Sequence, residues 1–448
     1  MHSDVIDKFN SFYFIGIGGV SMSALAKYLL VLGKRVGGSD VSANEYTDEL
    51  TALGVETFFA NGADEIENYD FVVYTDAINE NDLRLKRALE LSKPAMSRGP
   101  FLYEVSKRFK TVIGVSGCHG KTTCCSMLAH IFAAAGKAFA AHIGGKDLTY
   151  SNFYCSGYDY FITEACEYKK NFLYLKPSVA IILNSGADHV ECYGSEEALK
   201  AAYLEFASGA ESTVALYGDL SGLNAVSFGL DKSADYSAVN VRTENGITSF
   251  TVCEKGEKYE GFKLKVCGKH NVLNALAAAA AARATGISFD CIKAGLSSFT
   301  GVERRFEKLD EIGGVKYYAD YAHHPDELRA SLKTVRKING GRLFVVFQPH
   351  TYSRTKLLFK QFIAALSPLE YLLINKSFAA REYFDDSGSA LTLSQSIKGS
   401  RYGDCEEDIC DFISSAEKGD TVLFLGAGDI YFIAKRLCAS AWHTKKQG

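Results

Sequence analysis

The sequence has little net charge and no long hydrophobic run. Its 448 residues include 49 Lys and Arg against 53 Asp and Glu, which leaves a net charge of −4. Such a balance gives no global electrostatic reason to expect nucleic acid or an anionic membrane as a partner. The alanine-rich stretch 275–282 is bounded by Asn274 and Arg283, and no segment approaches the roughly 20 apolar residues that cross a bilayer. We therefore expect a protein without nucleic-acid or membrane partners.

The sequence also lacks paired cysteines and a signal peptide. Its twelve cysteines are spread from Cys118 to Cys438 without a C-x-x-C pair, and the first ten residues, MHSDVIDKFN, contain no apolar core. These features favour reduced thiols and a cytoplasmic location. There is no internal repeat and no low-complexity linker to mark domain boundaries. A chain of 448 residues with 47% hydrophobic residues is long enough for about two to four domains.

Apolar runs typical of strands alternate with amphipathic helices along nearly the whole chain, which indicates α/β architecture with mainly parallel sheets. The first such unit begins with an apolar run at 12–15 and the glycine-rich turn GIGGVS at 16–21. This turn resembles a dinucleotide-type fingerprint. Its third glycine is replaced by Ser21, so a plain tight turn before a buried helix fits about as well. If the turn binds a nucleotide, the expected contacts are Gly16, Gly18, Gly19 and, at a ribose, Asp40.

The most specific single motif is TVIGVSGCHGKTT at 111–123. An apolar run leads into a glycine-rich turn and then into a predicted helix through Ala135, which is the arrangement of a phosphate-binding loop. The backbone N–H groups of the turn and the helix N-terminus attract an anion, Lys121 can reach terminal phosphates, and a threonine can hold Mg²⁺. Only two residues separate the two glycines, so the loop is a short variant. The expected phosphate-binding residues are Gly117, Cys118, His119, Gly120, Lys121, Thr122 and Thr123.

Polar residues follow two further predicted strands. Glu164 ends the apolar run 160–163, and a second run at 179–183 leads into Asn184, with His189 shortly beyond. Because ligands of open parallel sheets bind at the carboxyl ends of the strands, Glu164 and His189 are candidate Mg²⁺ ligands. A carboxylate suits Mg²⁺ better than an imidazole, so His189 alone would more often be structural.

Two asparagines precede the alanine-rich helix, which is predicted to end at Thr285. Asn271 and Asn274 could contact a base edge or a ribose. Asparagine is also an ordinary helix cap, and the local sequence does not decide between these roles.

Two histidine-rich corners lie in the last third of the chain, each between a predicted strand and a predicted helix. The first is DYAHHP at 320–325, where Pro325 suits a first helical turn. The second is FQPHTYSRT at 347–355. Two such corners after parallel strands imply one polar crevice. Zn²⁺ binding by His323 and His324 is disfavoured, because no third ligand has a suitable local spacing.

Together these segments resemble the Mur ligases. They occur in the family's order and span essentially the whole chain, so the set is highly specific although most members are modest alone. The segments are GIGGVSMSALA at 16–26, GCHGKTT at 117–123, EACEY at 164–168, ADH at 187–189, GKHNVLNA at 268–275, RRF at 304–306, DYAHHP at 320–325, FQPHTYSRT at 347–355 and GAGDI at 426–430.

The resemblance implies three domains. They are a Rossmann-like domain at 1–108 that binds UDP-N-acetylmuramate, a central P-loop ATPase domain at 109–308, and a C-terminal dinucleotide-fold-like domain at 309–448 that binds the amino acid. The pattern is most similar to the members that join L-alanine to UDP-N-acetylmuramate in peptidoglycan synthesis. The implied cofactors are ATP and Mg²⁺, the implied intermediate is an acyl phosphate, and we expect a monomer or weak dimer.

The resemblance also implies a role for each matching residue. Lys121 would neutralise the γ-phosphate, Thr122 or Thr123 and Glu164 would hold one Mg²⁺, and His189 would serve a second. The remaining implied contacts are Asn271 and Asn274 with the adenine or ribose, Asp320 with the ATP ribose, Arg305 with the phosphates, Arg98 and the turn Gly16, Gly18 and Gly19 with the UDP-sugar, and Tyr321, His323, His324, His350 and Arg354 with the amino acid.

Several positions depart from the usual family pattern. Cys118 replaces a threonine, Cys166, Tyr168 and Lys169 stand in an otherwise acidic motif, and Gly186 and Pro100 replace acidic residues.

Three alternatives therefore stay open. One is a murein-peptide recycling ligase, which would use the same UDP-sugar. Another is a folate- or cyanophycin-type relative, although such a protein would lack the N-terminal domain. The third is a catalytically silent UDP-sugar or nucleotide-binding regulator.

Overall fold

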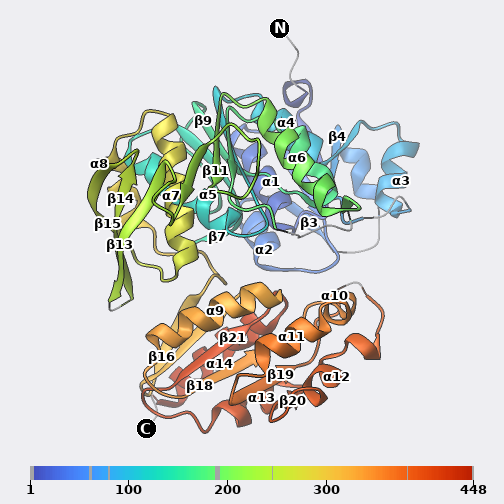
Figure 1. The fold of residues 1–448 in the computed structure, drawn as a ribbon. Coiled ribbons are helices and arrows are strands. Elements are labelled where there is room, and N and C mark those ends of the chain that lie inside the picture. Colours follow the sequence, from blue (N-terminus) through green and yellow to red (C-terminus); the bar gives the residue numbers. More distant parts are fainter. Residues whose placement is uncertain are drawn as a thin grey trace. The chain divides into compact units, whose positions relative to one another are not determined.

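The computed structural model describes residues 5–59, 63–78, 81–186, 192–244, 246–380 and 382–445. The chain forms two compact units, Met1–Val302 and Glu303–Gly448 (Figure 1). Among the described residues the first unit contains two sheets and the second contains one. None of the helices in the described part is both long and apolar enough to cross a membrane.

The first sheet has five strands, all parallel, in the order β3-β2-β1-β4-β5. Its central strand β1 is buried along its whole length, as expected for a parallel strand covered on both faces. The strands are β1 (Ser11–Ile15), β2 (Arg35–Ser39), β3 (Glu56–Phe58), β4 (Phe71–Tyr74) and β5 (Ala95–Ser97). The helices are α1 (Val20–Val31), α2 (Glu45–Ala52), α3 (Leu83–Glu90) and α4 (Arg98–Ser106), with 3₁₀ turns η1 (Ile6–Lys8) and η2 (Asp64–Asn68).

The second sheet has ten strands in the order β15-β14-β13-β12-β11-β10-β6-β9-β7-β8. The strands from β13 to β7 in this order are parallel, and both edges are antiparallel. The strands are β6 (Thr111–Ser116), β7 (Phe139–Asp147), β8 (Ser151–Cys155), β9 (Tyr160–Glu164), β10 (Val179–Ile182), β11 (Ser212–Leu216), β12 (Val226–Gly229), β13 (Tyr236–Glu244), β14 (Ile247–Glu254) and β15 (Glu257–Leu264). The helical segments are α5 (Lys121–Ala134), η3 (Tyr168–Tyr174), α6 (Glu196–Ser208), α7 (Lys269–Ala284) and α8 (Phe289–Ser298).

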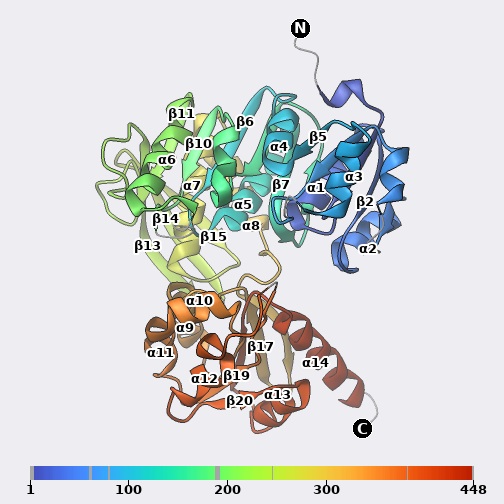
Figure 2. The ribbon, with the colours of Figure 1, turned by 90° about the vertical axis from the view of Figure 1, so that its right-hand side faces the viewer.

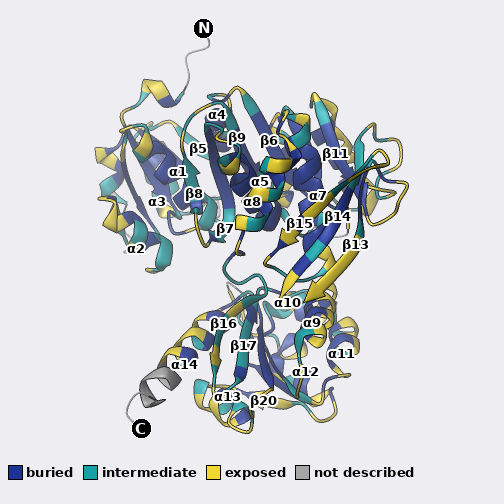
Figure 3. Cartoon of the chain, turned by 90° about the vertical axis from the view of Figure 1, so that its left-hand side faces the viewer, coloured by how far each residue is buried: buried dark blue, intermediate teal, exposed yellow. Residues whose placement is uncertain are grey.

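Helix α7 is buried on all sides in the core of the second sheet. Residues 275–282 are at most 2% exposed, and the helix contacts strands β10 to β13 together with α5 and α8. Alanine has the highest helix propensity and a small side chain, so this run can form a helix and let its neighbours approach closely. The burial changes along β13, which is buried at its start and exposed at its far end (Figure 3).

The first sheet is attached to the second through α1, which packs against β7 and β8 (Figure 2). Lys27 of α1 is largely buried at this contact. Its ammonium lies 2.6 Å from a carboxylate oxygen of Glu49 and donates a hydrogen bond of 2.7 Å to the side chain of Asn152. A buried cation is tolerated there because it has an anionic and a neutral acceptor.

The third sheet forms the second unit, in the order β16-β17-β21-β18-β19-β20. Only its edge strand β16 is antiparallel to its neighbour. A hydrophobic cluster covers each face. The strands are β16 (Glu307–Ile312), β17 (Val315–Asp320), β18 (Leu343–Phe347), β19 (Tyr371–Asn375), β20 (Arg401–Gly403) and β21 (Thr421–Leu425). The helices are α9 (Pro325–Ile338), α10 (Tyr352–Leu357), α11 (Phe359–Leu366), α12 (Ala390–Gln395), α13 (Glu406–Ile413) and α14 (Ile430–Lys445), with a 3₁₀ turn η5 (Asp386–Gly388).

The predicted α/β architecture with mainly parallel sheets is confirmed. Two elements differ from the sequence-based expectation. Residues 95–98 read in the sequence as the edge of a strand, but β5 ends at Ser97 and Arg98 begins helix α4. The alternation of strands and helices also stops between β11 and β15, where five strands follow one another. The boundaries at 108 and 308 stay predictions.

Candidate functional site

The phosphate-binding loop predicted from the sequence joins β6 to α5 and contains two glycines with left-handed backbone angles. Gly117 has φ +126°, and a side chain there would lie 3.0 Å from backbone atoms of Asn184. Gly120 has φ +90°, and its Cβ would stand 2.4 Å from Oδ1 of Asn274. Only glycine fits both the angle and the close approach. The loop is therefore packed between the end of β10 and the start of α7.

The segment after β10 fixes the middle of the loop. The backbone N–H of His119 donates to Asn184 Oδ1 at 3.1 Å, and Asn184 Nδ2 donates back to the His119 carbonyl at 3.0 Å. The Cys118 thiol donates to the carbonyl of Gly186, with a sulfur-to-oxygen distance of 2.7 Å. Asn184 thus acts on the loop as a two-point clamp.

Lys121 begins α5, and its side chain is only 15% exposed. Its ammonium donates to the carbonyl of Gly117 at 2.5 Å and to Glu167 Oε2 at 2.8 Å. Burial works against the charged form, but the neighbouring acidic groups, chiefly the Glu167 carboxylate, together raise the pKa of Lys121 above its ordinary value. The lysine is thus held as a cation at the base of the loop.

Two candidate Mg²⁺ ligands lie on either side of a glycine pair in β7. Glu164 Oε1 accepts a hydrogen bond of 2.7 Å from the N–H of Gly144, and a Cβ at Gly144 would stand 2.3 Å from Glu164 Oε2. A Cβ at the next residue, Gly145, would stand 2.8 Å from Cγ2 of Thr122. The two glycines make room for both side chains. A hydroxyl and a carboxylate are the hard oxygen donors that Mg²⁺ prefers, so the residues fit this ion.

The third candidate ligand, His189, lies outside the described residues. Within the described part of the chain, no group of three or more His, Cys, Asp and Glu side chains has an arrangement that could hold a metal ion. A Mg²⁺ ion beside β7 would therefore need the Glu164 carboxylate, the Thr122 hydroxyl and phosphate oxygens of a nucleotide together.

The asparagines at the start of α7 have different surroundings. Asn271 Nδ2 donates to the carbonyl of Cys267 at 2.7 Å, which ties the first turn of α7 to the segment before it. Asn274 points to the phosphate-binding loop, where its amide packs on Gly120. Both are at most 7% exposed. Their contacts with an adenine or ribose stay predictions.

The glycine turn of the first sheet is closed by Asp40. Gly16 has φ +84° and donates its N–H to the carbonyl of Ser39 at 2.7 Å, while the N–H of Gly18 donates to Asp40 Oδ2 at 2.7 Å. The carboxylate therefore bonds to the turn itself, and its contact with a ribose stays a prediction. The Nε of Arg98 lies 3.9 Å from Asp76 Oδ2 at the carboxyl end of the same sheet.

A cluster of rings and cations lies at the carboxyl ends of β17 and β18 in the second unit. The guanidinium of Arg305 lies 4.9 Å from the ring centre of Tyr321, which contacts the ring of His323 at 5.3 Å. His323 in turn lies 5.6 Å from the ring of His350. Arg354 Nη1 is 3.3 Å from His350 Nδ1. The structure thus brings together five of the predicted residues of this unit.

Burial keeps the histidines of this cluster neutral. It lowers the pKa of His350 to about 4, and the charges of His323 and Arg354 act in the same direction. It also lowers the pKa of His323. Nearby, burial raises the pKa of Asp320 to about 6, against the effect of its hydrogen bond from Ser331. The arrangement leaves the arginines as the cations that an anionic ligand would meet.

His324 has a separate position. Its ring accepts the N–H of Asp326 at 3.4 Å and so caps the N-terminus of α9. Its catalytic role stays a prediction.

Family models match almost the whole chain. The Mur ligase family catalytic domain matches residues 11–110, the Mur ligase middle domain residues 115–282, and the Mur ligase glutamate ligase domain residues 304–428. The chain belongs to the Mur ligase family.

Individual Mur ligases are similar over nearly their full length. A UDP-N-acetylmuramate–L-alanine ligase of Acetivibrio thermocellus is 36% identical, over 96% of each chain. The enzyme of the same name from Clostridium acetobutylicum is 38% identical, over 94% of this chain and 96% of its own. The crystal structure of UDP-N-acetylmuramate–alanine ligase from Thermotoga maritima superposes with a TM-score of 0.86 at 28% identity, covering 97% of this chain and 99% of its own.

Three residues that organise this Mur ligase were not among the predicted site residues. They are Asn184, which clamps the phosphate-binding loop, Glu167, which pairs with Lys121, and His142 of β7. The ring of His142 bridges Ser21 Oγ and Thr163 Oγ1, at 2.9 Å each. Each of these three residues acts on a segment at least 20 residues away in the sequence. Nothing local in the sequence indicates such a partner.

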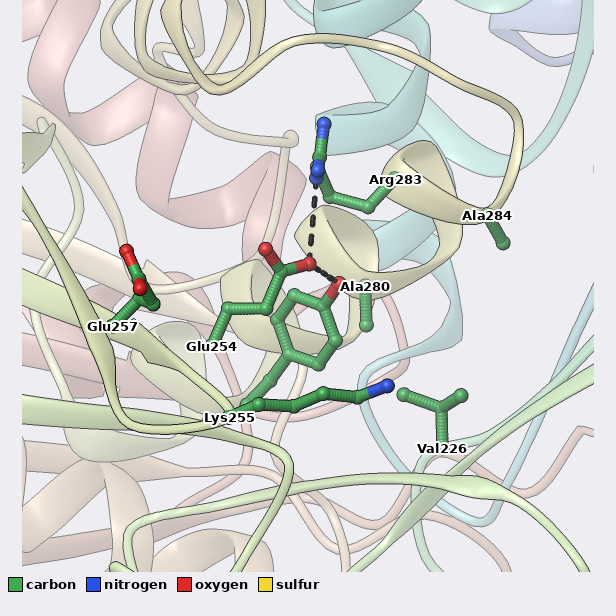
Figure 4. Close-up of a pocket in the computed structure, with 8 residues that line it drawn as sticks. Val226, Glu254, Lys255, Glu257, Ala280, Arg283 and Ala284 are labelled. Carbon is green, nitrogen blue, oxygen red and sulfur yellow. Dashed lines mark hydrogen bonds and ion pairs between the residues drawn. The ribbon is translucent and has the colours of Figure 1, made fainter.

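A separate cavity of about 420 Å³ lies at the other end of α7. Figure 4 shows Glu254 on its wall, where Oε1 accepts hydrogen bonds from Arg283 Nε, at 3.4 Å, and from the Tyr236 hydroxyl. None of the predicted site residues lines this cavity. Three of its polar side chains, those of Tyr236, Glu254 and Arg283, thus bond to one another.

Proposed function

We propose that this chain joins L-alanine to the lactyl carboxylate of UDP-N-acetylmuramate in an ATP-dependent reaction of peptidoglycan precursor synthesis. The observation that carries the proposal is the full-length similarity to ligases of that name, at 36% and 38% identity. It is supported by the phosphate-binding loop with Lys121 at its base. It is also supported by Thr122 and Glu164, the candidate Mg²⁺ ligands beside Gly144 and Gly145. Three functional domains, with boundaries near 108 and 308, belong to the same proposal.

The reaction needs an activated carboxylate, because a free carboxylate would have to expel oxide. A carboxylate oxygen first attacks the γ-phosphorus of ATP, ADP leaves, and an acyl phosphate forms. The neutral amine of L-alanine then attacks the carbonyl carbon, the bond from that carbon to the phosphate oxygen breaks, and the amine loses a proton. The reacting groups are mostly anions, so catalysis rests on positioning and on neutralisation of charge.

In the first unit, the phosphate-binding loop would supply both the positioning of the phosphates and the neutralisation of their charge. Its N–H groups and the N-terminus of α5 would hold the phosphates, and the Lys121 ammonium would neutralise the γ-phosphate. Mg²⁺ bound at Thr122 and Glu164 would offset further phosphate charge. In the first sheet, the turn Gly16–Gly19 and Arg98 would receive the UDP-sugar.

The ring cluster of the second unit would bind the amino acid. Arg354 can form a two-point hydrogen bond with the carboxylate of L-alanine. Its contact with His350 orients the guanidinium without neutralising it, because the imidazole is uncharged at neutral pH. Tyr321 and His323 would border the small methyl side chain, while Arg305 and Asp320 would contact the nucleotide.

The deciding experiment measures ADP and phosphate release with UDP-N-acetylmuramate plus one of two acceptors. We expect turnover with L-alanine and little with an L-alanyl-γ-D-glutamyl peptide. Turnover with the peptide alone would assign the chain to murein-peptide recycling, and release with neither acceptor would favour a silent binding protein. Sedimentation of the same preparation would test the expected monomer or weak dimer.

A further inference from the structure

Glu167 lies just after β9 in the EACEY segment and is only 2% exposed. Its carboxylate receives three hydrogen bonds. The N–H of Gly117 donates to Oε1 at 2.5 Å, and the Lys121 ammonium donates to Oε2 at 2.8 Å. The hydroxyl of Tyr203 in α6 donates to Oε1 at 3.3 Å. One buried side chain thus connects the first residue of the phosphate-binding loop with its lysine.

The backbone of Glu167 is held as firmly as its side chain. The hydroxyl of Tyr193 donates to its carbonyl at 2.6 Å, and the N–H of Lys170 donates to the same oxygen at 2.9 Å. A buried carboxylate is unfavourable unless it is paired and hydrogen-bonded. Here every partner is either fixed on another element or part of the loop. Movement of Glu167 away from the loop would separate its negative charge from the positive charge of Lys121 inside the protein.

We propose that Glu167 is a positioning residue for the phosphate-binding loop, which holds the Lys121 ammonium at the base of the loop and fixes the loop's first N–H. The part of this inference that concerns turnover rests on the proposed function. The part that concerns nucleotide affinity holds for any reaction that uses ATP at this loop. Glu164 is the side chain that faces Mg²⁺ in the proposed function, whereas Glu167 acts through Lys121 and Gly117.

The test is Glu167→Gln, which keeps the shape of the side chain but removes its charge and presents an N–H₂ group to donors. We expect the Kd for ATP, measured by calorimetry, to rise about tenfold. We expect kcat to fall about 10- to 100-fold, while the KM values for L-alanine and UDP-N-acetylmuramate stay within about twofold. Glu167→Asp restores the charge with a shorter reach, so it should recover part of both losses.

Glu49→Gln is the control, because it removes the carboxylate of another Lys–Glu pair in the same unit, in which partly exposed Glu49 lies 2.6 Å from largely buried Lys27. It should lower Tm comparably and leave the Kd for ATP unchanged. If Glu167→Gln does not fold, the test uses Glu167→Asp alone. The proposal then requires this variant to raise the Kd for ATP at least about threefold.

Parent-like ATP affinity and kcat in the variants would show that Glu167 only stabilises the fold. Tighter ATP binding would show that it competes with phosphate for Lys121, and either result overturns the proposal. Failure of the parent chain to ligate alanine would refute the proposed function and leave the affinity comparison intact.

Discussion

A buried histidine at the contact between the two sheets of the first unit should make that unit sensitive to acid. His142 of β7 is 3% exposed, and its ring lies between Ser21 at the start of α1 and Thr163 at the end of β9, 2.9 Å from each hydroxyl. Burial lowers the pKa of His142 to about 4, and the positive charge of Arg98 adds to the effect. The folded protein therefore keeps this imidazole neutral at pH values where a free histidine is protonated.

The sign of the pH dependence follows from proton linkage. Above the ordinary pKa of 6.5 neither the folded nor the unfolded chain protonates His142, so its contribution to stability is complete. Between 6.5 and about 4 only the unfolded chain takes up the proton, and the free energy of unfolding decreases as the pH falls. The difference of about 2.5 pH units corresponds to a loss of about 3 kcal/mol, at about 1.4 kcal/mol per unit.

His142→Gln isolates this contribution, because glutamine offers a donor and an acceptor to the two hydroxyls but does not titrate. Urea unfolding of the first unit can be followed by pulse labelling of Cys124 and Cys125, which are fully buried in its core. Between about pH 7.5 and 4.5, which covers most of this range, the parent should lose about 2.5 kcal/mol more than the variant. Equal losses in the two proteins would refute the reasoning.

Three further predictions concern the proposed reaction. Lys121→Ala should reduce turnover by two or more orders of magnitude, about 3 kcal/mol of transition-state stabilisation, and a parent-like ligation rate would contradict its role. Glu164→Ala should raise the Mg²⁺ concentration needed for half-maximal activity by more than Cys166→Ala does, and an unchanged Mg²⁺ dependence would make Glu164 structural. Arg354→Lys keeps the charge but loses the planar fork, so the KM for L-alanine should rise while the KM for ATP stays constant. An equal rise in the KM values for L-alanine and ATP would contradict a specific role of Arg354 in binding the amino acid.

The parts of the fold that could be predicted are those encoded over a few consecutive residues. The strand, turn and helix around Gly117–Lys121 need only an apolar run, two glycines and a lysine at the start of a helix. The same holds for the corners at 320–325 and 347–355, which the structure brings into one ring cluster. The two corners follow β17 and β18, which are separated by β21 in the sheet. In a parallel sheet the carboxyl ends of all strands lie along one edge, so residues at the two corners come together without any local signal.

The parts that could not be predicted depend on pairing between distant segments. Asn184 clamps a loop 65 residues earlier, and Glu167 pairs with a lysine 46 residues earlier. Asparagine and glutamate at such positions are ordinary surface or capping residues until the strand order places them beside the loop. The β13–β15 extension was missed for a related reason, because an antiparallel edge interrupts the alternation of strands and helices that the rest of the chain follows.

The exchange of residues around the phosphate-binding loop has a consistent electrostatic explanation. Cys166 stands in a motif that is otherwise acidic, and burial raises the pKa of its thiol and keeps it neutral. The surroundings of Lys121 therefore contain one negative charge fewer, and Glu167 alone makes the direct ion pair with it. At position 118 a thiol still donates to the carbonyl of Gly186, so the hydrogen bond that a hydroxyl could make is retained. The thiol at position 118 thus helps to anchor the loop, and the carboxylate of Glu167 pairs directly with its lysine.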